Sequence, residues 1–114
     1  VDIVTSGDAM TLVLLYSLVS IWAPIVEESI FRGSLFRHLR SRMGVIAAAV
    51  ASAVVFGVMH GYEWMLLSPV IALGLIFAMM RDRRGSLIGP VVMHALHNGI
   101  LMACMLAVLK LSGE

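Results

Sequence analysis

Charged residues are scarce in this 114-residue sequence. Asp, Glu, Lys and Arg make up 13% of it, while 61% is hydrophobic. Ordinary soluble chains are about a quarter charged and about half apolar. A soluble domain of this size has too much surface to carry so apolar a composition, so the bilayer is the expected solvent. The net charge of +1 gives no reason to expect a nucleic-acid partner.

Several catalytic patterns are also missing. Cys104 is the single cysteine, so an internal disulfide is excluded, and no clear partner supports cysteine-type hydrolysis. Neither the GxSxG pattern of serine hydrolases nor the HExxH pattern of zinc proteases occurs. The first apolar run does not resemble a signal peptide, because it lacks a basic segment before it and ends in acidic residues.

Four long runs without Asp, Glu, Lys or Arg divide the sequence. They cover residues 9–26, 43–59, 64–80 and 85–109, with 18, 17, 17 and 25 residues. A transmembrane helix needs about 17–25 apolar residues. The runs are continuous and do not alternate, which favours helices over barrel strands. We therefore predict an all-α, polytopic transmembrane helical bundle with about four spans.

Arginines are concentrated in two of the connections between these runs. The segments 37–42 and 81–84 are rich in Arg, whereas "HGYEW" (60–64) contains no Lys or Arg. The first and third connections of a four-span protein lie on the same side of the membrane. The positive-inside rule then predicts cytoplasmic loops at 37–42 and 81–84 and both termini outside. We expect a multi-pass integral membrane protein surrounded by membrane lipids.

Small residues recur at four-residue steps in the second and third runs. They are Ala49, Ala53, Gly57, Gly74 and Ala78. Small side chains let membrane helices approach closely, so the second run is expected to form a central helix. Pro24 removes a helical hydrogen bond and is expected to kink the first span just before its acidic residues.

Two adjacent carboxylates, Glu27 and Glu28, follow the first run. Arg32 lies four residues after Glu28, so these two meet on one helix face as an ion pair. A local pair that only neutralises a helix end explains them about as well as a functional role does. Glu27 lies about 100° around the helix and needs a proton or a partner from another helix. An acid at the water interface is the weaker explanation for it.

The last run contains His94, His97 and Asn98. His94 and Asn98 lie on one helix face, and His97 lies on a neighbouring one. Interhelical hydrogen bonds, worth about 1 kcal/mol each, explain one such residue better than three. His60 ends the second run, where a lone histidine is usually an interfacial residue.

The depths of these residues along their helices can be compared. Counted from Arg37, Glu27 lies roughly 15 Å in, at about 1.5 Å per residue. Counted from the start of the last run, His94 and Asn98 lie roughly 13 and 20 Å in, so they can share a plane with Glu27. His60 lies roughly 25 Å from the start of its run and is expected to be too far toward the outer face, unless its helix is tilted, displaced or begins outside the membrane.

The residue types permit two kinds of hydrolytic chemistry. A carboxylate beside an imidazole can hold a water and remove its proton, while a second imidazole and an amide stabilise an oxyanion. Alternatively, two His and one Glu can bind zinc with one open position, where the metal activates the water. The cofactor is therefore none or a divalent metal such as zinc, with Glu27, His60 and His94 as its ligands.

Three motifs occur in order on predicted membrane helices. "EESIFR" (27–32) matches EExxxR, "FGVMH" (56–60) matches FxxxH, and "HALHN" (94–98) matches HxxxN. Together they resemble the CPBP family of intramembrane proteases, which includes CAAX prenyl endopeptidases of the Rce1 type and bacterial Abi-type proteins. The resemblance implies a helical membrane endopeptidase of the glutamate or metallo type. Its substrate would be a peptide or protein, with or without a lipid group.

The resemblance also implies roles for individual residues. The catalytic residues would be Glu27, His60, His94 and Asn98. The supporting residues would be Glu28, Arg32 and Phe56. The first two catalytic residues would hold and activate the attacking water, and the other two would stabilise the oxyanion. We expect residues 1–114 to form a single membrane-embedded catalytic core that is part of a longer polytopic protein.

Two other functions use the same residues. In a non-catalytic membrane immunity or scaffold protein, the polar side chains would only lock helices together. In a piece of a proton-coupled transporter, Glu27 would carry a proton. The transporter is less favoured, because neither repeat symmetry nor paired broken helices is apparent.

Overall fold

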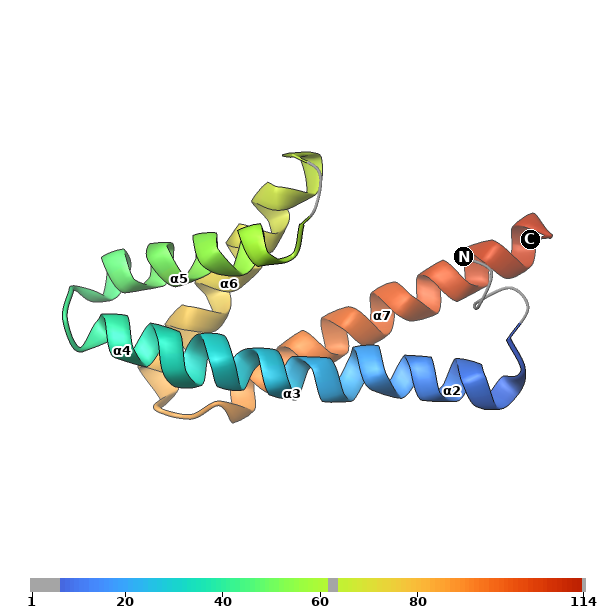
Figure 1. Ribbon diagram of the computed structural model, residues 1–114, viewed down its shortest axis with the longest axis horizontal. Coiled ribbons are helices and arrows are strands. Elements are labelled where there is room, and N and C mark those ends of the chain that lie inside the picture. The colour runs from blue at the N-terminus through green and yellow to red at the C-terminus, as the bar shows by residue number, and fades with distance from the viewer. Residues whose placement is uncertain (1–6, 62–63, 114) are drawn as a thin grey trace. The chain divides into compact units, whose positions relative to one another are not determined.

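The computed structural model describes residues 7–61 and 64–113, and its regular structure there is helical (Figure 1). The prediction of an all-α fold is confirmed. The connection "HGYEW" falls partly outside the described residues. The chain divides into two compact units: the Glu27–Pro90 unit, and a terminal unit made of Val1–Val26 and Val91–Glu114.

The first long helix runs from Ala9 to Arg40. Its segments are α2 (Ala9–Ser17), the π-helical turn η1 (Leu18–Trp22), α3 (Ala23–Glu28), the π-helical turn η2 (Ser29–Leu35) and α4 (Phe36–Arg40). Asp8 caps the start of α2, because its carboxylate accepts the Thr11 N–H at 2.8 Å. This hydrogen bond lowers the pKa of the Asp8 carboxyl. The two π-helical turns flank the segment that carries both adjacent glutamates.

Among the residues that the structure describes, three helices are long and apolar enough to cross a membrane: Ala9–Arg40, Met65–Arg84 within α6 (Trp64–Arg84), and α7 (Ile88–Ser112). The second predicted span, 43–59, corresponds to α5 (Val45–Met59). It has 15 residues, below the about 17 that a span needs. Large apolar side chains such as Leu14 and Val58 are more than 60% exposed, as expected for a surface that faces lipid. The helices indicate an integral membrane protein.

The core of the Glu27–Pro90 unit is built where α5 packs on α6 and α4. It consists of Phe36, Ala48, Ala49 and Ala78. A Cβ added at Gly74 would lie 3.0 Å from the Ala53 Cβ, and one at Gly57 would lie 2.7 Å from Ile71 Cγ1. The small residues therefore permit the close helix approach that their spacing predicts.

Candidate active site

Arg32 is fully buried at the centre of the Glu27–Pro90 unit. Its Nη1 lies 2.9 Å from Glu28 Oε1, and both side chains are 0% exposed. The ion pair expected from the four-residue spacing is therefore present, and it is a buried pair. The second terminal nitrogen, Nη2, donates to the Gly74 carbonyl of α6 at 3.1 Å. The guanidinium thus joins the first helix to α6.

Three aromatic rings surround the same guanidinium. Arg32 Cζ lies 4.4 Å from the ring centroid of Phe56, 5.3 Å from Phe77 and 6.0 Å from Phe31. These distances allow cation–π attraction, which strengthens when the cation is desolvated. The rings of Phe31 and Phe56 also meet edge to face, with centroids 5.0 Å apart. Because the rings come from the first helix, α5 and α6, one cation holds three elements together.

The imidazole ring of His60, at the end of α5, is held in its orientation by Phe56. Its Nδ1 lies 2.7 Å from the Phe56 carbonyl oxygen. A carbonyl only accepts hydrogen bonds, so Nδ1 must carry the proton. The ring of Phe56 also packs on the imidazole, with centroids 4.2 Å apart. Phe56 therefore contacts both the Arg32 guanidinium and the imidazole, and links the buried cation to His60.

The other ring nitrogen of His60 faces Glu27. His60 Nε2 and Glu27 Oε2 are 3.3 Å apart, with the side chains 21% and 29% exposed. With Nδ1 protonated, a neutral imidazole presents a lone pair at Nε2, opposite a carboxylate that also accepts. Such a contact is favourable when the pair holds one further proton, or when a water donates to both groups. The Nε2 lone pair and the carboxylate can therefore both accept hydrogen bonds from one donor.

This arrangement overturns the depth estimate made for His60. The first helix ends at Arg40, beyond the boundary assumed at Arg37, and α5 begins at Val45. From these ends, Glu27 lies roughly 20 Å and His60 roughly 22 Å along their helices, at about 1.5 Å per residue. The two side chains reach the same level. The expectation from the sequence is wrong because the first helix extends past Arg37 to Arg40 and α5 begins two residues after the start of its uncharged run.

In the terminal unit, Asn98 donates to a carbonyl that lies close to a proline. Its Nδ2 is 3.1 Å from the Val19 oxygen. In η1, amides bond to the carbonyl five residues earlier, as Ala23 N–H does to Leu18 O. The next amide in this register would be that of Pro24, which has no N–H to offer Val19. The Asn98 side chain replaces the missing donor.

The remaining polar residues of α7 also lie in the terminal unit. His94 is 4% exposed, and His97 is partly buried. The Tyr16 hydroxyl donates to the Gly99 carbonyl at 3.2 Å. A primary amide has two N–H groups, so Asn98 can bind Val19 and still donate to another acceptor. The structure therefore brings Glu27 and His60 together in one unit, while His94 and Asn98 belong to the other.

A metal centre is not assembled by the residues that the structure places together. Within residues 7–61 and 64–113, no group of three His, Cys, Asp or Glu side chains could hold a metal ion. The Glu27–Pro90 unit contributes two candidate ligands, Glu27 and His60, whereas catalytic zinc sites use three.

Sequence reasoning missed three parts of this site. Phe31, Phe77 and the Gly74 carbonyl all contact Arg32, yet Phe31 fills an unspecified position of EExxxR and the other two lie outside the three motifs. Gly74 had been noted only as a small packing residue. A signal was present in the sequence: a buried arginine needs acceptors and rings, and α6 carries Phe77 close after a glycine that allows close approach.

These observations define a helical integral membrane protein in which a buried Arg–Glu pair and aromatic rings support a glutamate–histidine pair. The family of type II CAAX prenyl endopeptidases, Rce1-like, matches residues 9–100. The match covers most of the chain, and the chain belongs to this family, which is one of proteases. No curated protein and no solved structure matches the chain.

Proposed function

We propose that this protein is an intramembrane endopeptidase in which Glu27 and His60 activate the attacking water. The observation that supports this most directly is the 3.3 Å approach of His60 Nε2 to Glu27 Oε2. The hydrogen bond from Nδ1 to the Phe56 carbonyl fixes the tautomer that this role needs. Membership of a protease family supplies the reaction class.

The proposed reaction has two steps. A water donates one O–H to the Glu27 carboxylate and the other to His60 Nε2, which directs its oxygen lone pair at the substrate carbonyl. The oxygen attacks the carbonyl carbon while Glu27 takes the first proton, and the carbonyl electrons move to oxygen. Glu27 then returns that proton to the amide nitrogen as the C–N bond breaks.

The roles of His94 and Asn98 rest on the sequence motif alone. We propose that an N–H of His94 and the second N–H of Asn98 donate to the oxyanion formed in the first step. The first N–H of Asn98 is engaged by Val19.

Arg32 and Glu28 are proposed as positioning residues. The guanidinium contacts the ring of Phe56, and Phe56 contacts His60 through both its ring and its carbonyl. The Glu28 carboxylate balances the buried charge at 2.9 Å. Neither side chain has to touch the substrate, because their effect reaches the water through the orientation of the imidazole.

A cleavage assay tests the proposal. The substrate is an internally quenched peptide ending in a CAAX sequence, prepared with and without a farnesyl group and added to purified protein in detergent. We expect cleavage of the farnesylated peptide, and a loss of about 10²–10⁴-fold in kcat for Glu27→Gln with unchanged accumulation in membranes. Asp82→Asn removes a carboxylate outside the site and should retain full activity.

Two outcomes would contradict the proposal. Normal cleavage by Glu27→Gln would show that this carboxylate is not the base. A non-catalytic immunity or scaffold protein would cleave neither peptide, and Glu27→Gln would then change only abundance or stability. Cleavage of the peptide without farnesyl at an equal rate would still support an endopeptidase, and it would show that the substrate does not need a lipid group.

A further inference from the structure

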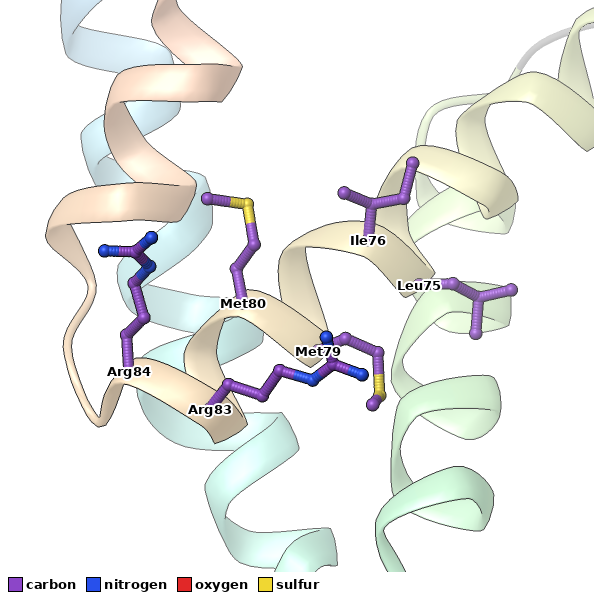
Figure 2. Close-up of a pocket in the computed structure, with 6 residues that line it drawn as sticks. All are labelled: Leu75, Ile76, Met79, Met80, Arg83 and Arg84. Carbon is purple, nitrogen blue, oxygen red and sulfur yellow. The ribbon is translucent and has the colours of Figure 1, made fainter.

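A groove follows one face of α6 in the Glu27–Pro90 unit (Figure 2). Its volume is about 460 Å³, within the range of about 300–1,000 Å³ that is common for small-ligand sites. The lining residues are Leu75, Ile76, Met79, Met80, Arg83 and Arg84. Four are apolar and two are cationic, so the groove does not have the uniform lining of a helix-packing surface.

The apolar and the cationic lining residues occupy different parts of the helix. They form two rows at four-residue steps, and each row reads apolar, apolar, Arg. Residues four apart lie one above another on a helix, about 6 Å apart along its axis. The groove is therefore apolar over its first turns and cationic at the end of α6, as Figure 2 shows.

The two arginines differ from Arg40 in charge pairing. Arg40 pairs with Asp82 at 3.0 Å. Within residues 7–61 and 64–113, no carboxylate forms an ion pair with Arg83 or Arg84, and none lines the groove. Guanidinium groups match phosphate geometry closely, and basic pockets at the ends of membrane helices bind lipid headgroups.

We propose that this groove binds one anionic phospholipid. The phosphate lies between Arg83 and Arg84, and an acyl chain follows Leu75, Ile76, Met79 and Met80 toward the membrane interior. The charge of the groove end selects an anionic head over a zwitterionic one. Ile76 is 53% exposed, so the chain can enter from the side. The site is separate from Glu27 and His60 and does not depend on the proposed proteolysis.

Lipid titration followed by native mass spectrometry tests the site. The full chain in detergent micelles is titrated with phosphatidylglycerol or with phosphatidylcholine of the same acyl chains. We expect one phosphatidylglycerol per chain to bind more tightly than phosphatidylcholine. Arg83→Gln with Arg84→Gln should weaken phosphatidylglycerol binding about 30-fold, since each charge near an anionic headgroup contributes a factor of about five. Arg37→Gln with Arg42→Gln removes the same charge outside the groove and should leave binding unchanged.

A second variant tests the apolar part without altering charge. Ile76→Trp fills the groove and should abolish tight binding, whereas Val58→Trp, on the exposed face of α5, should not. Equal binding of the two lipids, or equal weakening by both arginine pairs, would overturn the proposal. Displacement of the lipid by millimolar inorganic phosphate would overturn it in favour of a simple anion site. Unchanged binding in Ile76→Trp would also overturn it, leaving the groove to another occupant, such as a further helix.

Discussion

The two units use their buried polar side chains differently. In the Glu27–Pro90 unit, the charged side chain of Arg32 is surrounded by the Glu28 carboxylate, a backbone carbonyl and three aromatic rings. In the terminal unit, the neutral groups of Asn98 and Tyr16 donate to backbone carbonyls. One unit stabilises a cation, whereas the other completes the hydrogen bonding of its helices.

This difference predicts effects of very different size. A buried charge that loses its partner has a large desolvation cost, because the remaining group cannot be hydrated. A neutral hydrogen bond between membrane helices contributes about 0.6 kcal/mol on average, because the separated helices find other partners. Substitutions of the buried charges in the Glu27–Pro90 unit should therefore reduce stability much more than substitutions of the neutral hydrogen-bonding residues in the terminal unit.

The largest effect is expected at Arg32. Arg32→Met keeps most of the side-chain volume but leaves the Glu28 carboxylate buried without its cation. We expect a loss of about 3–5 kcal/mol in the free energy of unfolding, measured by denaturant titration in mixed micelles. A loss below about 1 kcal/mol would show that the pair is far better hydrated than its 0% exposure indicates.

The double substitution Glu28→Leu with Arg32→Met distinguishes the effect of the ion pair on stability from its effect on the orientation of His60. Removing both charges together should restore most of the stability. Cleavage should stay impaired, because the cation no longer packs on Phe56 and the imidazole loses its orientation. A double variant that regains full activity would show that the pair has no positioning role.

The next largest effect is expected at Gly74. A Cβ there would lie 3.0 Å from the Ala53 Cβ and 3.1 Å from Arg32 Nη2, so Gly74→Ala must separate α5 from α6. We expect a destabilisation of about 1–3 kcal/mol, observed as a lower thermal midpoint. Gly44→Ala is the matched control, because no atom lies within 4 Å of its added Cβ. Equal midpoints for the two variants would contradict the close packing.

A smaller effect is expected at Asn98. Asn98→Ala removes the donor to Val19 and should cost about 0.6–1 kcal/mol. In a Pro24→Ala background the restored backbone N–H can satisfy the carbonyl, so the same substitution should cost less. The double-mutant cycle measures this coupling. Strict additivity would show that Asn98 does not compensate for the proline.

The smallest effect is expected for the exposed pair of Arg40 and Asp82. Its atoms lie 3.0 Å apart, close to the 2.9 Å of the buried pair, yet the side chains are 45% and 28% exposed. A double-mutant cycle with alanine should give a coupling below about 1 kcal/mol that decreases further at high salt. A coupling as large as that of Arg32 and Glu28 would show that contact distance, and not burial, sets the strength of these ion pairs.

The helices and the local ion pair could be predicted from the sequence because both depend on nearby residues. Uncharged runs marked the helices, and the four-residue spacing of Glu28 and Arg32 fixed their contact. The small residues of α5 and α6 also predicted close approach, which the space around Gly74 confirms. These features follow from helix periodicity and side-chain size alone.

The contacts between distant segments could not be predicted in this way. The Gly74 carbonyl lies 42 residues from Arg32, and Val19 lies 79 residues from Asn98. No periodicity specifies such pairs. The meeting of His60 with Glu27 depended on where two helices end, and helix ends are the least certain part of a sequence-based assignment. Pro24 did indicate a missing donor, but not which side chain would replace it.

The most direct test of the account is the kinetic coupling of Glu27 and His60. Glu27→Gln, His60→Ala and the double variant are compared for cleavage of the farnesylated peptide, at equal protein folding judged by thermal midpoint. Because the two side chains are proposed to act on one water as a unit, the double variant should lose no more activity than the more damaging single substitution. Losses that multiply, or a single variant with wild-type turnover, would contradict the proposed mechanism.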